Sequence, residues 1–188
     1  MRITLVSLDN WGFNNYIATA LKESGHNVQH LNFDEYEYKY QNSLYRIYNF
    51  FLKTFFKRNL KTIHYGKKII ENINKLNEIQ DVILVIKGDF IDPKSIVELK
   101  KYSKKTIAYF NDNTQRCPKI TRVLPFFDEV YSFEKEDCQK YNLKFATNWI
   151  YNSPSTDPNK NYKYKVFNII SKDKRLKTLS KIANNLEA

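Results

Sequence analysis

The chain has 188 residues, of which 42% are hydrophobic and 27% are charged, with only 4 glycines and 5 prolines. This composition excludes the disordered and fibrous classes. The length is sufficient for one large α/β domain, or for one domain and the start of a second. The formal net charge of +11 favours anionic partners. Part of this basic excess is compositional, because Lys, Asn, Ile and Tyr are all abundant, as in proteins from AT-rich genomes, so we do not expect a specific nucleic-acid partner.

Cysteine usage and hydropathy predict a reducing, cytoplasmic location. Cys117 and Cys138 form neither a disulfide framework nor a metal-ligand spacing, and neither has a neighbouring histidine. The opening segment 1–8 has too short an apolar run for a signal peptide, and no run of about eighteen apolar residues could span a bilayer. Any membrane contact is therefore expected to be peripheral, at the inner membrane.

Apolar strands alternate with helical patterns along most of the chain. Strands are expected at 2–8, 27–33, 81–88, 105–110, 128–133 and 144–149. Helices are expected at 14–25, 94–103 and 134–142, with a short one in 118–127. Strands separated by helices predict an α/β fold, namely a Rossmann-like parallel sheet with helices on both faces.

Two segments interrupt this alternation of strands and helices, one inside the predicted domain and one after it. Residues 1–150 are expected to form the Rossmann-like domain, and 34–80 a helical insertion, because this segment is too long for one crossover helix. It contains two helical patterns and predicts a helical hairpin or a helix with an inserted flap. The polar segment 151–163 contains two prolines and is typical of a linker, and 164–188 looks like one more strand and helix.

Ligands of open parallel sheets bind at the carboxyl ends of the strands, so the loops there hold the candidate site residues. The polar candidates are Asp9, Asn10 and Trp11 after the first strand, Lys87 and Gly88 after the third, and Asn111, Asp112, Asn113 and Arg116 after the fourth. Lys87 could offer a cation to a phosphate or carboxylate. Gly88 either lets the backbone approach a ligand or only provides a tight turn.

Several common sites are not expected. The first loop has only Gly12, so it lacks both the G-x-G-x-x-G dinucleotide fingerprint and the phosphate loop of ATP-binding proteins. The spacing of His26, His30 and His64 supports no Ser-His-Asp or Cys-His arrangement. We therefore predict no cofactor and no metal.

Four blocks of the sequence resemble, in order, those of the CgeB-like glycosyltransferases of bacterial lipopolysaccharide and capsule gene clusters. The blocks are "DVILVIKGDFIDPKSIVELKK", "TIAYFNDN", "FFDEVYSFEKEDCQKYNLKFATNWIY" and "YKVFNIISKDKRLKTLSKIA", within residues 81–186. The resemblance implies the N-terminal domain of a two-domain GT-B fold, followed by the start of the nucleotide-sugar domain. The implied activity is metal-independent transfer of a sugar from a nucleotide-sugar, bound through the second domain, to a surface-polysaccharide glycan.

The same resemblance implies that Asp112 lies near the acceptor sugar and assists catalysis, because these enzymes need a carboxylate or histidine near the attacking hydroxyl. The other carboxyl-end candidates would then bind the acceptor. An alternative is that Asp112 or Asn113 only caps the following helix. Since the chain ends before the residues that bind the diphosphate and ribose of the nucleotide-sugar in this family, we expect little catalysis from it alone. The alternative function is a non-catalytic module that binds a glycan or an anionic surface.

Segment 36–75 interleaves aromatic and basic residues and leaves three interpretations open. The first is an aromatic stripe that faces the core, with a solvated basic back. The second is peripheral docking on anionic lipid, with Lys53, Lys57 and Arg58 as the contacting cations. The third is nucleic acid, stacked on Tyr and Phe and held by Lys.

Overall fold

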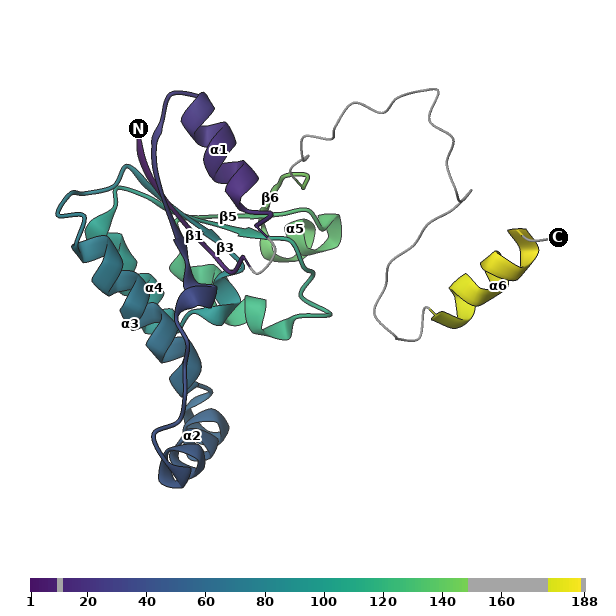
Figure 1. Ribbon diagram of the computed structural model, residues 1–188, viewed down its shortest axis with the longest axis horizontal. Coiled ribbons are helices and arrows are strands. Elements are labelled where there is room, and N and C mark those ends of the chain that lie inside the picture. Colours follow the sequence, from purple (N-terminus) through teal and green to yellow (C-terminus); the bar gives the residue numbers. More distant parts are fainter. Residues whose placement is uncertain (10–11, 149–175, 187–188) are drawn as a thin grey trace. The chain divides into compact units, whose positions relative to one another are not determined.

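The computed structural model describes residues 1–9, 12–148 and 176–186 (Figure 1). The chain divides into two compact units, Met1–Tyr151 and Asn152–Ala188. The expected linker and the strand expected after it lie outside the described residues. In the second unit the structure describes helix α6 (Leu176–Leu186).

A parallel sheet of six strands, counted over the described residues, forms the centre of the first unit in the order β2-β1-β3-β4-β5-β6. The strands are β1 (Arg2–Ser7), β2 (Asn27–Asn32), β3 (Val82–Ile86), β4 (Thr106–Phe110), β5 (Glu129–Ser132) and β6 (Lys144–Phe145). In β1, Ile3 is in register with Val28 of β2 on one side and with Val82 of β3 on the other. The chain therefore reverses its direction of sheet growth between β1 and β3, which is the topological switch point where ligands of such folds bind.

Helices cover both faces of this sheet, which confirms the predicted Rossmann-like α/β fold (Figure 1). The α-helices of the first unit are α1 (Asn15–Glu23), α2 (Ser43–Phe56), α3 (Leu60–Asn74), α4 (Pro93–Leu99) and α5 (Lys135–Tyr141). Because successive strand residues point to opposite faces, Leu5 packs with Ala18 of α1 while Val6 packs with Ile69 of α3 and Ile96 of α4.

Three predicted elements differ from the structure. The helix expected at 94–103 is α4, which ends at Leu99, followed by a 3₁₀ helix, Lys100–Tyr102. Segment 118–127 forms two 3₁₀ helices, η4 (Pro118–Arg122) and η5 (Leu124–Phe126), instead of one short helix. Pro125 has no N–H to donate, so the turn cannot continue as an α-helix there. The last strand, expected at 144–149, is shorter, because its ladder with β5 pairs only Lys144 and Phe145.

The insertion is a helical hairpin of α2 and α3, one of the two predicted arrangements. Lys57 ends α2 in a left-handed conformation, with φ of 52°. The buried Asn49 holds the hairpin together, because its Oδ1 accepts from the N–H of Leu60 at 2.8 Å and its Nδ2 donates to the hydroxyl of Tyr40 at 2.6 Å. Asn49 thus satisfies one of the free N–H groups at the start of α3.

The interpretation of the aromatic segment as a core-facing stripe is wrong. In α2 only Asn49 and Leu52 are buried. The exposed large apolar side chains of α2 are Leu44, Tyr45, Ile47, Tyr48, Phe50, Phe51, Phe55 and Phe56. The core contact is made by α3, whereas α2 lies beyond the end of α3, away from the sheet (Figure 1).

Close packing fixes α3 on α4. A Cβ placed on Gly66 of α3 would lie 2.2 Å from Oγ of Ser95 on α4, so only glycine allows this approach. Along the described ranges 1–9, 12–148 and 176–186, no helix is both long enough and apolar enough to cross a membrane.

Candidate functional site

The loop after β3 begins with a residue in an unfavourable backbone conformation. Lys87 has φ of 60° and ψ of 53°, the left-handed region that side-chain-bearing residues rarely adopt. Gly88, by contrast, does not have positive φ; it begins the 3₁₀ turn Gly88–Phe90, in agreement with the tight-turn alternative. A Cβ at Gly88 would lie 2.8 Å from Cζ of Phe127, so the glycine makes room for that ring and not for a ligand.

The strained Lys87 is aimed at Asp112, in the loop after the neighbouring strand β4. Its Nζ lies 2.7 Å from Oδ2 of Asp112, and Nη1 of Arg116 lies 3.6 Å from Oδ1 of the same carboxylate. The structure therefore brings together the predicted catalytic residue and two predicted binding residues. Both oxygens of Asp112 already have a cation partner.

Asp89 was not selected from the sequence, although it directly follows Gly88 at the end of a buried strand. Its Oδ1 is buried and has no hydrogen-bond partner, and the same is true of Oδ1 of Asn111. Burial raises the pKa of the Asp89 carboxyl, and the charge of Lys87 only partly opposes this effect. Two unsatisfied acceptors thus lie beside the Lys87–Asp112 ion pair, where a ligand hydroxyl or amide could donate to them.

The rest of the loop after β4 is held by structural hydrogen bonds. The N–H of Thr114 donates to Oδ2 of Asp137 in α5 at 2.7 Å, and its hydroxyl donates to Oδ1 at 2.5 Å. Oδ1 of Asn113 accepts from the N–H of Arg116 at 2.8 Å. Neither residue caps the following helix, because the N-cap position of η4 is Cys117 and no side chain caps it. Asn113 instead closes the turn 113–116, and Asp112 makes ion pairs.

The loop after β1 contributes less to this site than predicted. Asp9 is buried, and its Oδ2 accepts from the N–H of Asn14 at 3.0 Å, which fixes the turn into α1. Its own N–H donates to Oδ1 of Asn32 at 3.0 Å. The other two candidates of this loop, Asn10 and Trp11, lie outside the described residues.

A Ser-His-Asn row that spacing alone did not reveal joins β1, β2 and α1. Oγ of Ser7 lies 2.8 Å from Nε2 of His30, and Nδ1 of His30 lies 2.9 Å from Oδ1 of Asn15. This order resembles a catalytic triad, but Ser7 is 0% exposed, so a substrate cannot reach its hydroxyl. Burial lowers the pKa of His30, in agreement with a structural, neutral imidazole.

A basic cavity of about 310 Å³ lies between the α2–α3 junction and the loops after β3 and β4. Its cations are Lys53, Lys57, Arg58, Lys119 and Arg122, and its acidic residues are Asp89 and Asp92. The three predicted docking cations are therefore brought together in one place. Arg58 is fully engaged with the buried Asp92, through contacts of 2.9 and 2.8 Å. Because Asp89 lines this cavity, the cavity adjoins the Lys87–Asp112 site.

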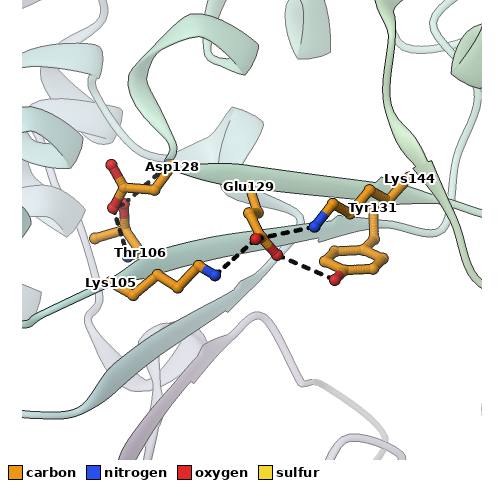
Figure 2. A network of polar contacts seen from close by, with 6 residues as sticks. All are labelled: Lys105, Thr106, Asp128, Glu129, Tyr131 and Lys144. Carbon is orange, nitrogen blue, oxygen red and sulfur yellow. Dashed lines mark hydrogen bonds and ion pairs between the residues drawn. The ribbon is translucent and has the colours of Figure 1, made fainter.

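The opposite, amino edge of the sheet shows how paired carboxylates behave in this protein (Figure 2). Glu129 accepts from Nζ of Lys105 at 2.6 Å and from Nζ of Lys144 at 2.9 Å, and these bonds lower its pKa to about 2. Asp128 accepts from the N–H and the hydroxyl of Thr106, both at 2.8 Å. The other oxygen of Glu129, Oε2, accepts from the hydroxyl of Tyr131 at 3.1 Å. Since these contacts join neighbouring strands, we interpret them as structural.

Comparisons with known proteins give no further assignment: no family, no curated protein and no solved structure matches the chain. In the part of the chain that the structure describes, no three His, Cys, Asp or Glu side chains gather as a metal-binding group. The class of the protein is therefore defined by its fold, a Rossmann-like α/β domain with a polar site at the carboxyl edge of its sheet.

Proposed function

We propose that this domain binds a hydroxyl-rich, anionic ligand at the carboxyl edge of its sheet, as the acceptor side of a GT-B type glycosyltransferase. One observation carries the proposal: beside the switch point, the strained Lys87 is paired with Asp112 next to the unsatisfied oxygens of Asp89 and Asn111. Unsatisfied buried acceptors and backbone strain both cost stability, and they are typical of sites that a ligand completes. The sequence resemblance to CgeB-like glycosyltransferases supplies the reaction class.

In this proposal the two carboxylates have different roles. The acceptor hydroxyl attacks the anomeric carbon of the sugar donor, the bond to the nucleotide diphosphate breaks, and the hydroxyl proton passes to a carboxylate. Asp89 suits the base role, because burial raises its pKa and therefore its affinity for that proton. Asp112, whose two oxygens face Lys87 and Arg116, would orient Lys87 toward an anionic group of the ligand.

A non-catalytic binding module remains the second candidate. It is favoured by the ion pairs of Asp112, because a carboxylate held by two cations suits recognition of a ligand at least as well as proton transfer. Both candidates predict the same ligand class. They differ only in whether a sugar is transferred to the bound ligand.

Ligand-observed NMR on the whole chain tests the binding step. The panel contains nucleotide-sugars, sugar phosphates and surface-polysaccharide oligosaccharides. We expect saturable binding of the anionic sugars, weakened about tenfold in Lys87→Gln, since one charge-assisted hydrogen bond is lost. The matched control is Lys101→Gln, an exposed lysine beyond the amino edge of the sheet. Absence of binding, or equal binding by both variants, contradicts the proposal.

Release of nucleotide diphosphate in the presence of donor and acceptor separates the two candidates. Transfer that is lost in Asp89→Asn while acceptor binding persists supports the enzyme. Binding without transfer, in a protein that includes a donor domain, supports the module.

A further inference from the structure

Helix α2 presents an apolar face to solvent that the rest of the described domain does not cover. Leu44, Tyr48, Phe51 and Phe55 follow one another at spacings of three and four residues, so they form one stripe along the helix. Leu44 and Phe55 are each 70% exposed. The rings of Phe51 and Phe55 stack with centroids 6.1 Å apart, which makes the stripe continuous. The two buried residues of the helix, Asn49 and Leu52, are not part of this stripe, and each of its four side chains is at least 50% exposed, so the stripe faces solvent.

The segment around this stripe carries charge of one sign. Residues 38–70 contain eight lysines and arginines and no aspartate or glutamate. Lys53 lies on α2 itself, and Lys57 ends the helix. Both line the basic cavity, together with Arg122, whose Nη1 donates to the backbone oxygen of Lys57 at 3.4 Å. A cluster of cations that could hold phosphate groups is therefore attached to one end of the apolar stripe.

We propose that α2 docks the domain on an anionic phospholipid bilayer. The stripe enters the boundary between headgroups and acyl chains, and the cavity cations Lys53, Lys57 and Arg122 contact lipid phosphates. Exposed aromatic and aliphatic residues on one helix face, with Lys and Arg beside them and no acidic residue, are the features that give interfacial helices affinity for anionic membranes. This inference does not depend on the proposed function.

Two other occupants fit the observations less well. A second copy packed through α2 would bring two acid-free basic segments together, and their like charges would repel. Nucleic acid binds through stacking on aromatic rings, but Leu44 and Ile47 on the exposed side have no ring. A bilayer accepts aliphatic and aromatic side chains alike, and its anionic headgroups attract the basic residues beside them.

Vesicle flotation with the full chain tests the proposal. The vesicles contain phosphatidylcholine alone or phosphatidylcholine mixed with phosphatidylglycerol. We expect binding to the mixed vesicles, falling as salt is raised, and little binding to neutral ones. Phe51→Ser combined with Phe55→Ser should weaken binding at least about tenfold, since two apolar rings no longer insert. Lys53→Gln combined with Lys57→Gln should weaken it about thirtyfold, at about 1 kcal/mol for each charge near the surface.

Matched controls lie away from α2. Phe145→Ser removes an exposed ring of β6, and Lys22→Gln combined with Lys101→Gln removes two charges from other surfaces. All variants change exposed residues, and equal thermal melts would confirm that they fold. The proposal is overturned if the wild-type chain does not bind anionic vesicles, or if the control variants weaken binding as much as the α2 variants. Another outcome is that sedimentation shows a dimer, that Phe51→Ser combined with Phe55→Ser dissociates it, and that the chain does not bind lipid. This result would assign the stripe to a second copy instead.

Discussion

The two edges of the sheet differ in how they accommodate carboxyl groups. At the amino edge, Asp81, Asp128 and Glu129 each pair with a different lysine, namely Lys104, Lys100 and Lys105. The pKa of each carboxyl is lowered, to about 2 for Asp81 and Glu129. At the carboxyl edge, burial raises the pKa of Asp89, and its Oδ1 has no partner.

This difference separates stability from function within one sheet. The amino-edge carboxylates pair with lysines of neighbouring strands and loops, and we interpret them as structural. A buried acceptor without a partner costs stability, so its retention at the switch point is the expected mark of a binding site. The contrast is not complete, because the hydroxyls of Thr4 and Ser103 are also buried without a partner away from the carboxyl edge.

Removal of the carboxylate that anchors the carboxyl-edge loop should give the largest effect. Asp137→Ala deletes the acceptor of both Thr114 hydrogen bonds, so we expect a loss of about 3 kcal/mol in the free energy of unfolding. Denaturant unfolding measures this loss. Glu136→Ala, an exposed neighbour in the same helix, should change it by less than about 0.5 kcal/mol. If the two variants are equally stable, the loop is not anchored as described.

A methyl group under the loop after β3 should have the next largest effect. Gly88→Ala places a Cβ 2.8 Å from the buried ring of Phe127, and we expect a loss of about 2 kcal/mol from overpacking. Calorimetric melting checks this value. Recovery of stability in the double variant with Phe127→Leu would confirm the clash, whereas an unchanged melting temperature for Gly88→Ala would contradict it.

Asp89→Asn should stabilise the protein at neutral pH by about 1 kcal/mol, because it removes a buried charge. Since the folded pKa of Asp89 is raised above its unfolded value of about 3.9, wild-type stability falls as pH rises between those two values. The advantage of the variant should therefore be present above that window and absent below about pH 3.9. Denaturant unfolding across pH measures it, and a destabilised variant at neutral pH would show that the charged form is satisfied.

The smallest effect is expected at the amino edge. The folded pKa of Glu129 is lowered to about 2, so its ion pairs stabilise the fold above the unfolded pKa of about 4.3 and lose this effect as pH falls toward 2. Glu129→Gln should lower the melting temperature slightly at neutral pH, by an amount that shrinks across this window. Glu136→Gln provides the matched control, and a difference independent of pH would rule out the ion pairs as its cause.

The helical hairpin shows where prediction from sequence stops. Both helices have apolar residues at helical spacing, and both were expected from that pattern. The pattern alone cannot say which apolar face meets the sheet, because exposed and buried stripes have the same period. In the structure Ile69 and Ile73 of α3 join the core, whereas Phe51 and Phe55 of α2 face solvent.

The candidate site divides in the same way. Lys87, Asp112 and Arg116 were predicted, because polar residues directly after buried strands must lie at one edge of a parallel sheet. Asp89 was missed, since the burial of its oxygen depends on tertiary packing that no local pattern records. For Gly88 the sequence left open a close ligand approach or a tight turn, and only the packing of Phe127 shows what lies where its side chain would be.

The sequence by itself determined the alternation of strands and helices, the parallel sheet and the strand ends that carry polar groups, because these follow from local periodicity and from the direction of the strands. Only the tertiary structure decided which carboxylates are paired, which aromatic stripe is exposed and which lysines gather in one cavity. These properties depend on contacts between residues far apart in the chain, and such contacts leave no period or spacing in the sequence.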